Sequence, residues 1–183
     1  MSKNLNVQRL NLPAFAQAGE PLVELTPLQN MERLAQEIHG PAPDLVINWR
    51  ASGELRARTG AEDDVWVHLE ARTSLPLTCQ RCMGPVATSL EIDQWYRFVA
   101  DEDIAMAEDD QSEEDLLVMA PQFDLLAVVE DELLMALPLV PMHETCPETP
   151  TFSAGEAELA QPDGEAPAKP HPFAALAQLK RSK

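Results

Sequence analysis

The stretch that decides the fold runs from residue 65 to residue 79 and reads VWVHLEARTSLPLTC. Apolar side chains occupy almost every second position, which predicts a β-strand with one buried face, because successive side chains of a strand point to opposite faces. The same alternation recurs in residues 45–52 (LVINWRAS) and 90–98 (LEIDQWYRF). These runs predict an antiparallel meander of three or four strands. Pro76 should lie at a sheet edge or a bend, because proline has no N–H to give to a neighbouring strand.

Two helices and a short strand are predicted around this meander. Thr26 and Pro27 can cap and start a helix that continues at helical spacing until Gly40, so we expect a helix over residues 26–39. A second helix is expected over residues 124–137, where Pro138 stops it, after a short strand at 116–119. Together these elements predict an α+β fold, with an antiparallel β-meander packed against two main helices.

The charge of the chain is strongly acidic and unevenly distributed. The 183 residues carry a formal net charge of -18. Residues 1–100 hold 12 acidic and 9 basic side chains, residues 101–168 hold 19 acidic and no basic ones, and residues 169–183 hold four basic ones. This balance argues against DNA or RNA binding through a broad basic surface, and against an anionic membrane surface.

The domain organisation follows from composition. We expect a single α+β domain over residues 1–146, with a flexible acidic loop at 101–115, where nine of 15 residues are acidic. Residues 147–171 are rich in Pro, Ala, Glu and Gly and predict a disordered linker, and residues 172–183 predict a short basic and apolar docking segment. We expect the protein in the cytoplasm for three reasons. Its first residues do not resemble a signal peptide, its longest apolar stretch is interrupted by charged residues and proline, and it has only three cysteines.

Four residues have the spacing of a metal site. Cys79 and Cys82 are separated by two residues, and so are His143 and Cys146. Together they would form a Cys₃His set typical of structural zinc. Two other interpretations stay open: the cysteines are ordinary thiols, with Cys79 a buried strand residue, or Cys79 and Cys82 are a redox dithiol. The redox interpretation is disfavoured because strands, and not a helix start, flank the pair.

One carboxylate of the second helix is expected to be buried. At 100° per residue, Glu132 falls inside the apolar arc of the helix. A buried carboxylate needs a partner, so Glu132 is expected to pair with Arg81 or Arg97 from the sheet, unless it reaches water at the helix edge.

Three separated blocks carry a resemblance to a known family. They are residues 77–82 (LTCQRC), 123–138 (FDLLAVVEDELLMALP) and 172–180 (PFAALAQLK). In composition, order and rough spacing they resemble the YceD family, the large ribosomal RNA subunit accumulation proteins. The resemblance implies a non-enzymatic cytoplasmic factor needed for accumulation of 23S rRNA. Many members have a further cysteine pair after the second helix, where this sequence has His143 and Cys146.

The resemblance leaves the partner open. In one mechanism the acidic region binds a basic ribosomal protein, and in another the arginines of the sheet contact pre-rRNA or a large-subunit precursor. The acidic run also has a simpler interpretation, a solvated loop that only confers solubility. An enzyme acting on RNA with zinc or a thiol is the alternative class. The arginines expected on one sheet face are Arg50, Arg56, Arg58, Arg72, Arg81 and Arg97. The side chains expected to contact a partner are Arg81, Glu130, Asp131, Glu132, Phe173, Leu176 and Lys180.

Overall fold

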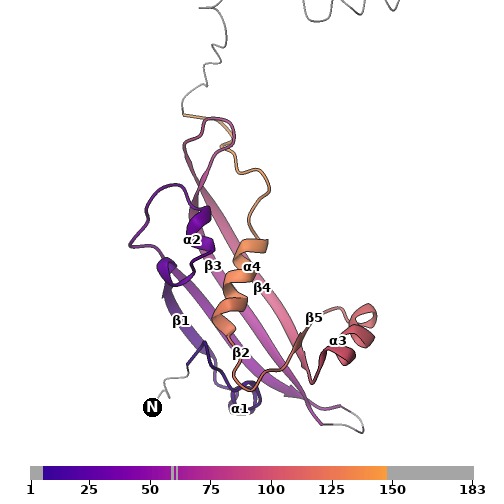
Figure 1. Cartoon of the computed structure of the whole chain (residues 1–183). Coiled ribbons are helices and arrows are strands. Elements are labelled where there is room, and N and C mark those ends of the chain that lie inside the picture. Colours follow the sequence, from indigo (N-terminus) through magenta and orange to yellow (C-terminus); the bar gives the residue numbers. More distant parts are fainter. Residues whose placement is uncertain (1–5, 59, 61, 148–183) are drawn as a thin grey trace, which may run out of the picture. The chain divides into compact units, whose positions relative to one another are not determined.

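The computed structural model describes residues 6–58, 60 and 62–147 of the chain, and its centre is a five-stranded sheet (Figure 1). The strands lie in sequence order, β1 to β4 antiparallel and β5 parallel to β4. The strands are β1 (Leu22–Pro27), β2 (Val46–Arg56), β3 (Asp64–Thr78), β4 (Pro85–Val99) and β5 (Asp115–Val118). The helices are α1 (Leu12–Ala18), α2 (Leu34–Glu37), α3 (Glu102–Glu108) and α4 (Leu125–Met135), with 3₁₀ turns η1 (Leu28–Asn30) and η2 (Asp109–Gln111).

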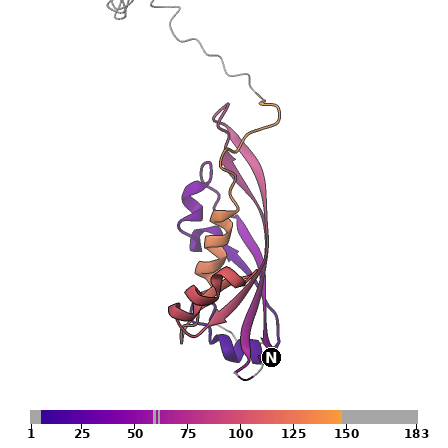
Figure 2. The ribbon, with the colours of Figure 1, turned by 90° about the vertical axis from the view of Figure 1, so that its right-hand side faces the viewer.

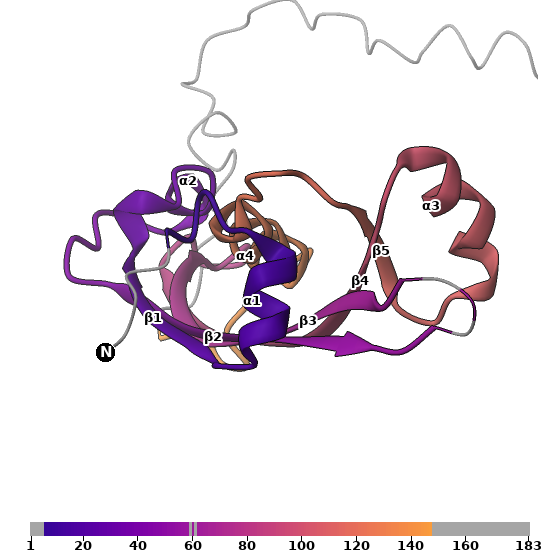
Figure 3. The same ribbon diagram turned by 90° about the horizontal axis from the view of Figure 1, so that it is seen from below.

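The helices α1, α2 and α4 cover one face of the sheet (Figures 2 and 3). We call the other face the open face, although the acidic segment 101–115 packs against it at Arg97. Side chains on the covered face, such as Trp49, Leu69 and Tyr96, are almost fully buried, together with Phe15 of α1 and Val129 of α4. The α+β class and the three central strands are therefore confirmed. So are the strand expected at 116–119, which is β5, and the helix expected at 124–137, which is α4.

The hairpin of β3 and β4 extends beyond the rest of the sheet. The pairing of β2 with β3 ends at Asn48 and Arg72, whereas β3 and β4 stay paired as far as Thr78 and Pro85. We call the part of this hairpin beyond Arg72 the β3–β4 ribbon. Pro76 lies in this ribbon, where β3 has only one neighbouring strand, so the predicted edge position is confirmed. Its carbonyl oxygen accepts a hydrogen bond from the His39 backbone N–H at 2.6 Å.

The helix expected over residues 26–39 is wrong for most of its length. Thr26 and Pro27 are the last residues of β1, and only the short elements η1 and α2 follow. The Thr26 side chain does not cap a helix, because its Oγ1 accepts a hydrogen bond from the buried Trp49 indole N–H at 2.9 Å. Pairing with β2 therefore outweighs the local helix-start signal. The apolar positions Leu28, Met31 and Leu34 are nevertheless buried, as their spacing implied.

Helix α1 was not anticipated, although its signals are present in the sequence. Asn11 Oδ1 accepts a hydrogen bond from the backbone N–H of Ala14, which is the usual role of an N-cap. Pro13 lies in the first turn, and Gly19 ends the helix in the left-handed region with φ of 63°. The helix is only seven residues long, which is too short for a clear apolar period.

Gly53 of β2 lets α1 lie directly on the sheet. A Cβ atom at this position would be 2.8 Å from the Ala16 Cα and 2.8 Å from the Phe15 Cδ1. We expect Gly53→Ala to lower the free energy of unfolding by about 2 kcal/mol, because backbone and not only a flexible side chain must move. Urea unfolding measures this, with Ser52→Ala on the open face as the matched control. A Gly53→Ala protein as stable as the wild type would show that α1 packs less closely.

Candidate functional site

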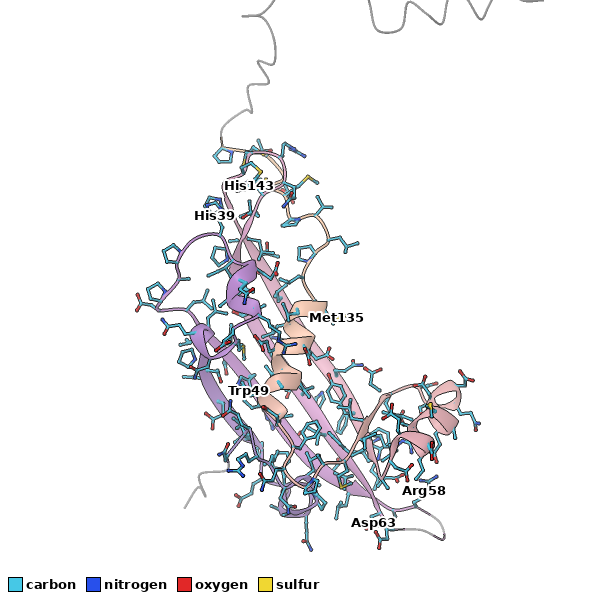
Figure 4. All side chains as sticks on the ribbon, in the orientation of Figure 1. His39, Trp49, Arg58, Asp63, Met135 and His143 are labelled. Atoms are coloured by element: carbon cyan, nitrogen blue, oxygen red, sulfur yellow. The ribbon has the colours of Figure 1, made fainter. Side chains whose placement is uncertain are left out.

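The four predicted metal ligands meet at the end of the β3–β4 ribbon. Cys79 and Cys82 belong to the turn between β3 and β4, and His143 and Cys146 to the segment after α4. Their ligand atoms all lie within 4.8 Å of one another. Figure 4 shows His143 at this end of the molecule, far from Arg58 and Asp63 at the opposite end. The sequence spacing therefore identified residues that the fold does bring together.

The distances within this Cys₃His cluster suit a tetrahedral ion. The Cys79 and Cys146 Sγ atoms are 4.0 Å apart, and the Cys82 Sγ lies 3.5 Å from the His143 Nδ1. Zinc bonds of about 2.3 Å to sulfur and about 2.0 Å to nitrogen require separations of about 3.5–3.8 Å between ligands. His143 Nε2 lies 3.1 Å from the carbonyl oxygen of Pro85. A proton donated to that carbonyl leaves the Nδ1 lone pair facing the three sulfurs.

Backbone hydrogen bonds hold this turn in shape. The Cys79 N–H donates to the Gly84 carbonyl and the Met83 N–H donates to the Cys79 carbonyl, each at 2.9 Å. Met83 adopts the left-handed region with φ of 61°, which closes the turn tightly. The Gln80 N–H donates to the Pro141 carbonyl at 2.9 Å and so attaches the segment after α4 to the turn. Both ligand pairs are thus positioned by backbone contacts that do not involve the sulfurs.

The cluster also has the electrostatics of a cation site. Burial opposes ionisation of Cys79, yet hydrogen bonds from the backbone of Cys82, His143 and Arg81 outweigh it and lower the pKa of Cys79 to about 5. The pKa of Cys146 is raised, first by burial and then by the neighbouring Cys82 and Cys79 sulfurs. A thiolate therefore forms readily at Cys79, while a second one beside it is disfavoured without a positive charge. A four-ligand set leaves no open position for a substrate, which is the pattern of a structural site.

The acidic segment 101–115, which the sequence predicted to be a flexible loop, contains regular secondary structure. It forms α3 and η2, and Asp101 Oδ1 accepts a hydrogen bond from the Ile104 N–H at 2.9 Å. The physical reason is that arginines neutralise part of its charge. Arg97 is only 7% exposed and contacts Glu108 at 2.6 Å and Glu114 at 3.1 Å.

Arg58 also holds the acidic segment against the sheet. Its guanidinium lies 2.8 Å from Glu108 and 3.6 Å from Asp64. Hydrogen bonds from Arg58 and Arg97 lower the pKa of Glu108. Several exposed carboxylates of the segment have no basic partner among the described residues. They are Glu102, Asp103, Asp109, Asp110 and Glu113, which we call the acidic arm.

Four of the six arginines expected on one sheet face lie there, but each is paired with a carboxylate. Arg50, Arg56 and Arg72 pair with Glu70, Glu54 and Glu91 respectively, and Arg97 is covered by the acidic segment. Arg58 and Arg97 hold the acidic segment, and Arg81 lies in the cysteine turn at the other end. A continuous basic surface is therefore absent from the part of the chain that the structure describes.

Aromatic side chains accompany Arg56 on the open face. Its guanidinium lies 3.7 Å from the ring centroid of Trp66 and 4.6 Å from that of Trp95. The other stacking contact of Trp95 is with His68, at 4.4 Å between centroids. The ring faces of Trp66 and Trp95 are thus already in contact with neighbouring side chains. We therefore interpret this cluster as one that stabilises the open face.

The buried carboxylate of α4 is Glu130, and the pairing expected for Glu132 is wrong. Glu130 is 9% exposed and contacts Arg33, which the sequence did not suggest as a partner. Arg97 forms ion pairs with Glu108 and Glu114 of the acidic segment instead. Arg81 makes no ion pair within residues 6–58, 60 and 62–147. Glu132 is half-buried beside Tyr96, whose pKa is raised first by burial and then by the Glu132 carboxylate.

Some predicted partner residues cannot be placed. Phe173, Leu176 and Lys180 lie outside the described residues, as do the segments 148–171 and 172–183. Asp131 is exposed and pairs with Arg33. Within the described residues, no helix has the length and apolar character needed to cross a membrane.

Comparisons with known proteins agree on one family. Residues 67–180 match the family profile described as large ribosomal RNA subunit accumulation protein YceD. A Haemophilus influenzae protein of that name is 40% identical over 115 residues, which cover 61% of this chain and 63% of the relative. The match thus spans less than two thirds of the relative's length. No solved structure matches the chain. Because the family profile covers more than half of the chain, including β4, α4 and all four cluster residues, this protein belongs to the YceD family of large ribosomal RNA subunit accumulation proteins.

Proposed function

We propose that this protein is a non-enzymatic, cytoplasmic ribosome-biogenesis factor that supports accumulation of 23S rRNA by binding a basic ribosomal protein. Family membership and the printed name of the relative support the large-subunit role. The observation that carries the choice of partner is the acidic arm, whose five carboxylates project from a folded and anchored segment. A fixed array of negative charge attracts cationic proteins and speeds their association.

The charges of the sheet support a protein partner over direct RNA binding. Phosphate recognition requires arginine or lysine side chains that are available to neutralise the backbone. On the open face, Arg50, Arg56 and Arg72 each already face a carboxylate. An RNA strand would have to displace these carboxylates, whereas a basic protein would not.

The Cys₃His cluster is proposed to hold a structural zinc ion. Four protein ligands and a histidine oriented by a backbone carbonyl favour this role. No observation favours the alternative of a zinc- or thiol-dependent enzyme acting on RNA, because the proposed ion has no open coordination position. The single-domain organisation of residues 1–146, with a linker and a docking segment after it, also stays a proposal.

Complementation of a deletion strain tests the function. We expect the deletion to lower the amount of 23S rRNA and of large subunits, and the wild-type gene to restore both. A variant with Asp109→Asn, Asp110→Asn and Glu113→Gln should fail to restore them, because the acidic arm loses three charges. The matched control replaces three other exposed acids, Glu20→Gln, Glu37→Gln and Asp44→Asn, and should restore both.

The outcomes separate the two parts of the proposal. A normal 23S level in the deletion strain would overturn the large-subunit role. Restoration by both triple variants would overturn the acidic arm as the partner site and leave the large-subunit role standing. Ribosome profiles on sucrose gradients and quantification of 23S rRNA give these readouts.

A further inference from the structure

The strand β1 presents an open edge. It is the first strand of the sheet and pairs only with β2. Within the described residues, no backbone group of residues 22–26 makes a hydrogen bond outside this pair. In a strand, alternate residues direct their N–H and C=O groups to the same side, so half of the hydrogen-bonding groups of β1 face outward. Such an edge is a template for a further strand.

The two faces of this edge differ in chemistry. Val23 and Leu25 lie on the open face of the sheet and are 62% and 65% exposed. Glu24 points to the other face, where a groove of about 520 Å³ runs beside the strand. The groove is lined by Glu24 and Glu32, by amide side chains such as Gln29 and by a few apolar side chains, and among the described residues by no basic side chain. One side of the edge is therefore apolar and the other is acidic.

We propose that β1 receives an extended basic segment of a partner protein as a sixth strand. Side chains of an added strand alternate between the two faces. Every second residue would enter the groove, where lysine or arginine meets the carboxylates of Glu24 and Glu32. The residues between them would lie on the open face beside Val23 and Leu25, where apolar side chains fit. The preferred sequence is therefore an alternation of basic and apolar residues, bound by strand addition.

A second copy of this chain fits the edge less well. Pairing β1 with itself would place the Glu24 and Glu32 carboxylates of both copies along one groove, and like charges in such proximity destabilise the pair. The edge is also short, because Pro27 has no N–H and ends the strand. Nucleic acid is disfavoured for the same electrostatic reason, since the groove would repel phosphates.

This inference deepens the proposed function, because it defines a second surface and a sequence pattern for a basic protein partner. It is independent of the acidic arm, which lies at the opposite edge of the sheet beside β5 (Figure 1). The two surfaces can therefore be tested separately.

The test uses the full-length protein and two synthetic peptides of equal composition. One peptide repeats Lys-Val four times, and the other repeats Lys-Lys-Val-Val twice, which breaks the alternation. We expect the alternating peptide to bind about tenfold more tightly in calorimetry, since only this order places all lysines in the groove. We also expect it to slow hydrogen exchange of the backbone amides in residues 22–26.

Variants locate the binding. Glu24→Gln should weaken the alternating peptide about fivefold, and Leu25→Ser should weaken it as well. Glu37→Gln and Leu139→Ser are matched exposed controls and should leave binding unchanged. The triple variant of the acidic arm should also bind normally, which distinguishes failure here from failure of the proposed function. Equal affinity for both peptides, no binding at all, protection away from β1, or a dimer through β1 would each overturn the proposal.

Discussion

Replacing Cys79 with serine is expected to remove a bound zinc ion and to release the segment after α4 from the β3–β4 ribbon. The reason is that Cys79 is the buried ligand whose pKa is lowered to about 5, so it supplies the most readily formed thiolate. Wild-type protein purified with zinc in the medium should contain one zinc ion per chain by elemental analysis, and Cys79→Ser should contain none. Limited proteolysis between Leu137 and Thr145 should become about tenfold faster, because the segment opens more often.

Two further changes make this test specific. Cys82→Ser and His143→Ala should have the same effect, because each removes one of the four ligands. His39→Ala is the matched control: His39 contacts the Thr78 side chain at 3.1 Å, next to the cluster but outside it. It should keep its zinc and its resistance to protease. Wild-type protein without zinc, or a His39→Ala protein that also loses it, would contradict the predicted site.

Replacing Glu130 with alanine is expected to destabilise the fold, because this buried carboxylate joins α4 to the residues around α2. One oxygen of Glu130 accepts hydrogen bonds from the backbone N–H groups of Arg33 and Leu34, at 2.7 Å and 3.1 Å. The other accepts from the Arg33 guanidinium at 2.9 Å and 3.1 Å. We expect Glu130→Ala to lower the free energy of unfolding by about 2–3 kcal/mol, below the value for a fully buried pair because half of the Arg33 side chain is exposed.

The same contacts make a pH-dependent contribution to stability. Burial tends to raise the pKa of Glu130, but the hydrogen bonds from Leu34 and Arg33 outweigh it, and the net shift is downward. A group with a lowered folded-state pKa stabilises the protein above its unfolded pKa of about 4.3 and loses this contribution as the pH falls through the folded value. Urea unfolding of wild type and Glu130→Ala should therefore differ at pH 7 and converge in acid. Asp131→Ala is the exposed control and should change stability little.

The strands were predictable because their signal repeats over many residues. Residues 65–79 alternate long enough for the buried face to be identified from the sequence, and so do the strands beside them. The Cys₃His cluster was predictable for a different reason, since two pairs of residues that can bind a metal, with the same spacing, are a chemical pattern that does not depend on the fold.

The errors occurred where tertiary contacts decide a local choice. Thr26 has the features of a helix cap, but its hydroxyl oxygen instead accepts a hydrogen bond from the buried indole N–H of Trp49. Glu130 and Glu132 lie two positions apart on one helix, and only the approach of Arg33, 97 residues earlier in the chain, determines which is buried. The acidic segment folds because Arg97 and Arg58 contact it, and neither contact is visible in the local sequence.

The cysteine turn of the β3–β4 ribbon is far in sequence from its partners, because His143 comes 61 positions after Cys82 and Cys146 comes 67 positions after Cys79. During synthesis the first pair leaves the ribosome well before the second. The antiparallel strands β2, β3 and β4, which are joined by short connections, can therefore form first. Metal binding would then be a late step, because the third and fourth ligands are available only after α4 has been synthesised.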